Sequence, residues 1–276
     1  MAASRERLIE TVDSYLDALA ANDPSRLKLA PGARYTENGQ QLGFGRGIWR
    51  TSTGREKGGS YVADASTGQA CFLGAANEAG SAVVLALRLR LVDGAISEAE
   101  SLVVRQSRIM DAAAIVTPRS LYATSVEPAQ RSPREDLIKV ANSYLEAIEQ
   151  HDAGLVAVRD DCIRIENGVQ TILNEDWPSE AFRMGVAEQI RSGNVSHIAA
   201  VRERRFPAVD EERGLVFAIF FFDHPGRAAG AADASPFKFP NSMMAFELFK
   251  IAAGEIVQIE AIADVFPYGM KSGWSE

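Results

Sequence analysis

Histidine and cysteine are scarce in this sequence of 276 residues, which contains three histidines and two cysteines. The cysteines, Cys71 and Cys162, are too few for a disulfide framework and form no Cys-based metal motif. Because the histidine spacing fits no zinc motif either, we expect no metal and no cofactor. The longest apolar run, 215–222, has eight residues, far short of the roughly twenty needed to span a bilayer.

Excess basic charge and an N-terminal apolar segment are also missing. The formal net charge of -8 argues against a nucleic-acid partner, which needs clustered Lys and Arg to neutralise phosphates. Residues 1–7 lead directly into an amphipathic pattern, without the apolar core of a signal peptide. We therefore expect a cytoplasmic protein with neither a nucleic-acid nor a membrane partner.

What the sequence does contain is an internal repeat. Ser-Tyr-Leu-Asp-Ala at 14–18 and Ser-Tyr-Leu-Glu-Ala at 143–147 are each followed, at the same distance, by Glu-Asn-Gly at 37–39 and 166–168. A single offset of 129 residues relates all of these segments, and such a constant offset indicates tandem duplication. Each copy has the usual size of a domain. We place the first domain at 1–110, a proline-containing linker at 111–133 and the second domain at 134–276.

Each copy begins with a helix and continues with strands. Apolar residues at helical spacing in 8–19 and 137–148 predict amphipathic helices, and a further helix is expected over 179–190. Asp93-Gly94, between two β-rich runs, predicts a hairpin. This order defines an α+β fold. The expected strands are 33–37, 61–65, 69–77, 81–92 and 96–105 in the first copy, and 162–166, 195–206, 215–222, 242–251 and 255–265 in the second.

The second copy is longer than the first. Glu100 and Glu260 each lie six residues after a hairpin glycine, and their offset of 160 exceeds 129 by 31 residues. The loop from Asp223 to Asn241, rich in Ala, Gly and Pro, is the most visible candidate for part of this gain. Long loops in compact domains often serve as lids or site walls.

The order of elements resembles the nuclear transport factor 2-like superfamily, which includes SnoaL-like polyketide cyclases and ketosteroid isomerases. The features that carry this resemblance are a helix with Tyr-Leu-x-Ala-Leu and Asn-Asp at its end, then a strand that closes in an acidic-polar turn, then a β-meander. The resemblance covers both copies. It implies two cone-shaped domains, each with helices packed on a curved antiparallel sheet around an apolar cavity. Because many members are dimers, it also implies a monomeric pseudo-dimer or a homo-oligomer.

The resemblance further implies candidate site residues. The tyrosine that donates a hydrogen bond to the developing enolate in the isomerases matches Tyr15 and Tyr144, although a core tyrosine with a satisfied hydroxyl is the alternative for both. The catalytic aspartate of the isomerases falls at or beside Asn38 and Asn167. Asparagine cannot act as a general base, so another base is needed.

The candidate bases are in the second copy, which holds all three histidines. His224 ends an apolar run beside Asp223. Strand alternation points Asn167 inward and leaves Glu166 outside or across an interface, where a turn or an interface is the alternative role for this carboxylate.

We predict a cofactor-free lyase, dehydratase or isomerase that transfers a proton on an apolar, aromatic small molecule. A lignin-derived diaryl compound is the most concrete substrate that the resemblance suggests. Two alternatives stay open: a non-catalytic binding or dimerisation scaffold, and a hydrolase that positions a water and needs a carboxylate inside the second domain. The predicted catalytic residues are His224, Glu166, Tyr144 and Tyr268, and the predicted substrate-binding residues are Asn167, Trp177, Phe237, Phe239 and Asn38.

Overall fold

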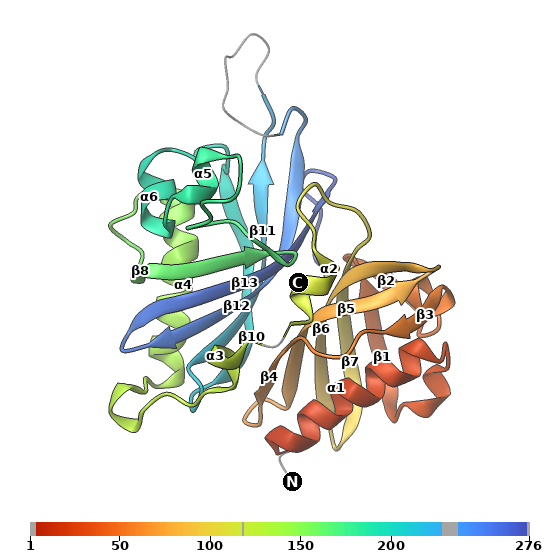
Figure 1. Cartoon of the computed structure of the whole chain (residues 1–276). Helices are drawn as coiled ribbons and strands as arrows, with labels where there is room; N and C mark the ends of the chain where they lie inside the picture. Colours follow the sequence, from red (N-terminus) through yellow and green to blue (C-terminus); the bar gives the residue numbers. More distant parts are fainter. Residues whose placement is uncertain (1–3, 118, 228–236, 275–276) are drawn as a thin grey trace.

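The computed structural model describes residues 4–117, 119–227 and 237–274. They form two halves of similar architecture, each with a long helix beside a sheet (Figure 1). The first half contains α1 (Arg5–Ala20), η1 (Pro24–Arg26), β1 (Leu29–Glu37), β2 (Gln40–Leu42), η2 (Gly47–Arg50), β3 (Ser52–Arg55), β4 (Ser60–Asp64), β5 (Gln69–Glu78), β6 (Ser81–Val92) and β7 (Ala95–Val104). The linker contains α2 (Ala112–Ile115), α3 (Ser120–Ala123) and η3 (Pro128–Gln130). The second half contains α4 (Arg134–Gln150), β8 (Val158–Glu166), β9 (Val169–Gln170), α5 (Glu180–Arg183), α6 (Val186–Arg191), β10 (Ala200–Asp210), β11 (Leu215–His224), β12 (Asn241–Ala252) and β13 (Glu255–Phe266).

Both sheets have the same plan. The strand orders are β2-β1-β7-β6-β5-β3, with β4 also paired to β5, and β10-β11-β12-β13-β8-β9. The predicted α+β fold with two helix-and-sheet domains is confirmed. Each sheet is mixed, whereas the resemblance implied an antiparallel one, because the first strand of each copy lies beside the last and runs parallel to it: β1 pairs with β7 and β8 with β13.

The two long helices form where apolar residues recur at helical spacing. Helix α1 buries Leu8, Val12 and Leu16 against the first sheet, and α4 buries Leu137 and Leu145 against the second. We call the buried interior between α1 and the first sheet the first cone. The interior enclosed by α4, α6 and the second sheet is the second cone.

The other faces of the two sheets pack against each other. Apolar side chains from both halves form one buried cluster, including Leu73 and Leu102 from the first sheet and Phe217 and Phe246 from the second. The halves therefore share a core instead of being joined only by the linker (Figure 1).

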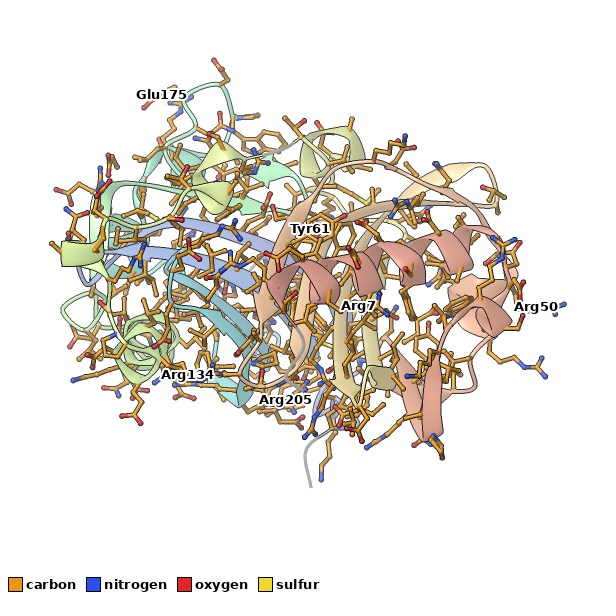
Figure 2. All side chains as sticks on the ribbon, turned by 90° about the horizontal axis from the view of Figure 1, so that it is seen from below. Arg7, Arg50, Tyr61, Arg134, Glu175 and Arg205 are labelled. Carbon is orange, nitrogen blue, oxygen red and sulfur yellow. The ribbon has the colours of Figure 1, made fainter. Side chains whose placement is uncertain are left out.

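Glu100 and Glu260, which occupy equivalent positions in the two copies, lie buried at this junction. Arg205 of the second half is 2.7 Å from Glu100 of the first, and Ser60 of the first half donates to Glu260 of the second at 2.7 Å. Arg119, in the linker, also pairs with Glu260 at 2.7 Å. Figure 2 shows Arg205 between the two halves.

The halves also exchange the segments that follow their last strands. Asp111 donates its backbone N–H to the carbonyl of Asn167 at 2.8 Å, and a Cβ on Gly168 would lie 2.0 Å from the carbonyl oxygen of Asp111. In the reciprocal contact, the Trp274 indole donates to Thr36 Oγ1 at 2.7 Å. Each Glu-Asn-Gly turn is thus covered by chain from the other half, as in a symmetric dimer.

Several element boundaries differ from the prediction: β1 and β8 begin four residues before the expected strands 33–37 and 162–166, and two further differences affect the second copy. The helix expected over 179–190 is split into α5 and α6, with Met184 extended and Gly185 capping α6. The strand expected at 195–206 begins at Ala200, because a turn in which Ile198 N–H bonds to Val195 precedes it.

Strand pairing locates the extra residues of the second copy. Val62 pairs with Cys71 in the first sheet, and the equivalent pair in the second sheet is Ala208 with Phe217, so these strands are related by an offset of 146 residues. The difference between 146 and 129 places 17 extra residues between the Glu-Asn-Gly turn and β10, and the difference between 160 and 146 places 14 in the loop after β11. We call residues 171–194, which contain α5 and α6, the cover segment. Residues 228–236 of the predicted lid loop lie outside the described residues.

Candidate active site

A group of polar side chains inside the second cone is centred on Arg164 of β8. Its Nη1 donates to the hydroxyl of Tyr144, on α4, at 3.1 Å, and its Nε lies 2.7 Å from Glu166 Oε1. Only 9% of Arg164 is exposed. Because side chains alternate along a strand, Arg164 and Glu166 share the inward face of β8 with the core residue Cys162.

The cover segment completes this group. Thr171 Oγ1 donates to Glu166 at 3.0 Å and accepts from Arg164 Nε at 3.0 Å. Gln189, on α6, accepts from Arg164 Nη2 at 2.8 Å and donates to the carbonyls of Thr171, at 3.0 Å, and Ala181. The cover segment therefore reaches into the cone through the hydroxyl of Thr171 and the buried amide of Gln189.

A second carboxyl group lies in the same cone. Glu247 of β12 is 3% exposed, and its Oε2 has no hydrogen-bond partner within the described structure. In the strand register, Glu166 and Glu247 flank Ala261 of β13, so their Cα atoms are about 10 Å apart, or two strand spacings. On the other side of Glu247 lies Ala218 of β11. Small side chains thus flank Glu247 on both neighbouring strands.

The two carboxyl groups have different surroundings. Burial raises the pKa of Glu247 to about 8; the charge of Arg164 opposes this rise and that of Glu166 adds to it. Glu247 therefore keeps its proton at neutral pH, whereas Glu166 is ion-paired with Arg164. Burial also raises the pKa of Tyr144, whose hydroxyl stays protonated.

This difference predicts a pH dependence of stability. The pKa of Glu247 is raised in the folded state, so its contribution is complete below the unfolded pKa, near 4.5, and is lost as the pH rises toward 8. Between pH 6 and 8 the free energy of unfolding should fall by up to about 1.4 kcal/mol per pH unit through this group. Urea denaturation of the wild type and of Glu247→Gln measures this effect. Equal slopes in the two proteins would contradict it.

The first cone is filled at the matching positions. Leu87 stands where the second copy has Glu247, and Phe72 where it has Ala218. Tyr35 replaces Arg164 and donates to Glu37 at 2.8 Å. Trp49, 1% exposed, packs edge-on against Tyr15 with ring centroids 5.1 Å apart. The combination of two carboxyl groups, Glu166 and Glu247, is thus a feature of the second cone.

Sequence reasoning assigned the wrong orientation to the second turn. Asn167 does not point into the cone, because its side-chain amide bonds to both the N–H and the C=O of Ala263, each at 3.0 Å. Asn38 bonds in the same way to Val103, at 2.7 and 3.1 Å. Both amides extend strand pairing, and Glu166 is the residue on the cone face.

His224 is brought close to none of these groups. It lies six residues along β11 from Ala218, the partner of Glu247, or roughly 20 Å away. Its ring stacks on His197 and lies 4.3 Å from that of Phe237 between centroids. Burial and the charge of His197 lower its pKa to about 4. Neighbouring Asp223 bonds instead to Arg202, at 2.7 Å, and to Ser242.

The other predicted contact residues are dispersed. Tyr268 and Phe239 are 51% and 70% exposed, and Trp177 stacks on Phe182 in the cover segment at 5.5 Å between centroids. Of the predicted site residues, only Tyr144 and Glu166 lie together in the second cone. Sequence reasoning missed Arg164, Thr171, Gln189 and Glu247.

Within the described residues, no group of three or more His, Cys, Asp or Glu side chains is arranged to hold a metal ion. In the same part of the chain, no helix combines the length and apolarity needed to cross a membrane.

Fold and site together define a tandem protein of two helix-and-sheet domains, with the architecture expected from the nuclear transport factor 2-like superfamily and one polar cone. The family model described as "Domain of unknown function (DUF8021)" matches residues 1–103 and 130–263. The chain therefore belongs to this family. No curated protein matches its sequence significantly.

Several solved structures are similar to one half of the chain. AusH from Aspergillus nidulans is 12% identical with a TM-score of 0.33, over 48% of this chain and 86% of its own. An LEH-like epoxide hydrolase from M. tuberculosis is 14% identical with a TM-score of 0.32, over 50% of this chain and 86% of its own. A protein of unknown function with a cystatin-like fold from Methylobium petroleophilum is 17% identical with a TM-score of 0.30, over 48% of this chain and 99% of its own.

Proposed function

We propose that this protein is a cofactor-free enzyme that performs general acid–base chemistry on a small, largely apolar molecule in the second cone. The observation that carries the proposal is the pair of carboxyl groups around Ala261. Glu166 forms an ion pair with Arg164, whereas Glu247 is buried with an unpartnered oxygen. Two carboxyls in such different surroundings, one ion-paired and one buried without an ion-pair partner, are suited to act as base and acid.

In this proposal Glu166 removes a proton and Glu247 donates one. Glu166 is the more accessible of the two, with 28% of its side chain exposed. Tyr144 accepts a hydrogen bond from Arg164, which leaves its own proton free to stabilise a developing oxyanion. A lyase, dehydratase or isomerase step on an aromatic molecule, such as a lignin-derived diaryl compound, needs only these groups.

A hydrolase is the second candidate. Activation of a water molecule requires at least one carboxyl group inside the second cone, and two are present there. Glu166 would then take a proton from water while Glu247 protonates the leaving oxygen. The two candidates differ in the source of the product oxygen.

The test is turnover of a panel of neutral aromatic and polyketide-like compounds by the purified protein, followed by mass spectrometry in water enriched in oxygen-18. Product formation without label is expected for the lyase, dehydratase or isomerase reaction, and one labelled oxygen is expected for the hydrolase. Absence of turnover across the panel would favour the binding or dimerisation scaffold.

A further inference from the structure

A buried arginine in a ligand cone would ordinarily suggest an anionic ligand, but each nitrogen of the Arg164 guanidinium already donates a hydrogen bond within the protein. Its Nε faces Glu166 and Thr171, its Nη1 donates to Tyr144 and its Nη2 to Gln189. Recognition of a carboxylate or phosphate by arginine uses a free pair of N–H groups. The acceptors around Arg164 come from α4, β8, the turn after β9 and α6, so both nitrogens of any edge of the guanidinium already donate to the protein.

Glu247 has the opposite character. It forms no ion pair with any residue that the structure describes, and its Oε2 is unpartnered. The groups with charge or a titratable proton that face it are Arg164, Glu166 and the Cys162 thiol from β8 and Tyr144 from α4. From the flanking strands β11 and β13 it meets Ala218 and Ala261.

We infer that the second cone selects an uncharged ligand that carries a hydrogen-bond acceptor oxygen, such as a ketone, ether or ester, and binds that oxygen at the Glu247 carboxyl group. The inference rests on the site of the proposed function. Arg164 and Glu166 already balance each other's charge, so a neutral ligand adds no unpaired charge to a buried site. An anion would face Glu166 without a free donor pair, and a cation would lie beside Arg164.

Three probes of similar size test this selection on the full chain: acetophenone, benzoate and benzylammonium, titrated at pH 6.5 and followed by protein NMR. We expect acetophenone to bind at least tenfold more tightly than either ion, with shifts at the amides of Ala218 and Ala261. Benzoate or benzylammonium binding as tightly as acetophenone, or no binding of acetophenone, would overturn the inference.

Two variants locate the selection at Glu247. Glu247→Gln keeps a neutral donor, so its affinity for acetophenone should stay within about threefold of the wild type. Glu247→Leu, which copies Leu87 of the first cone, should lose at least tenfold. Raising the pH to 9 should weaken acetophenone binding in the wild type but not in Glu247→Gln, and identical pH profiles would refute the assignment. Because these readouts measure binding, they stand even if no turnover is found, and turnover with a charged substrate would overturn this inference alone.

Discussion

Glu166→Gln should lower kcat/KM by about 10² to 10⁴-fold, the usual contribution of a general base. The amide keeps the size of the side chain and can still accept from Thr171 and Arg164, so binding of substrate should change less than turnover. Steady-state kinetics on the first substrate found in the panel measures the effect.

The first copy supplies the control. Glu37 matches Glu166 at the repeat offset, but it lies in the filled first cone and accepts from Tyr35 and from the backbone N–H of Ile48, each at 2.8 Å. Glu37→Gln should leave kcat/KM within about twofold of the wild type. Equal losses in the two variants would indicate a structural role for both glutamates and remove Glu166 from the mechanism.

The duplication could be predicted from the sequence because equivalent residues keep equivalent surroundings. Tyr15 and Tyr144 are both buried on the long helices, and Glu100 and Glu260 are both fully buried at the junction of the halves. A constant offset survives when the same contacts must be made twice. The pairing of the first strand with the last could not be predicted, because strand patterns do not specify which strands are neighbours.

The alternation of side chains along β8 could not predict which way Glu166 points, for a physical reason. Alternation identifies the buried face only when the other face is in water. Here one face of the second sheet lines the cone and the other packs against the first half, so apolar residues occupy both faces. Ile165 is 5% exposed although it points away from Arg164.

Glu247 did leave a signal in the sequence. It is the one charged residue in the apolar stretch 243–249, which reads Met-Met-Ala-Phe-Glu-Leu-Phe. A carboxyl group in the middle of a buried strand costs stability unless it is paired or protonated, so it is seldom retained without a role. The contacts of Arg164 with Gln189 and Thr171 left no such signal, since they depend on how the cover segment folds back over β8.

The largest loss of stability should follow removal of Glu100. Its carboxylate is fully buried and bonds to Arg88 at 2.8 Å and to Arg205 at 2.7 and 3.0 Å. Glu100→Ala leaves the 4% exposed Arg88 side chain with Glu98 as its one remaining ion-pair partner among the described residues, and it deprives Arg205 of its ion pair. Breaking a buried ion pair in this way costs about 3 to 5 kcal/mol of unfolding free energy, measurable by urea denaturation.

Glu98→Ala is the matched control, because it removes a carboxylate from the same strand. Glu98 pairs with Arg88 at 2.8 Å and with Arg90 at 3.0 Å, but its side chain is 22% exposed and Arg90 is 50% exposed. Water can replace the contact with Arg90, and Arg88 keeps its ion pair with Glu100 in this variant, so the expected loss is about 1 kcal/mol or less. Since Glu100 joins the halves through Arg205, its removal should also separate the unfolding of the two halves. Equal losses in both variants, with a single unchanged transition, would show that the buried charges do not hold the halves together.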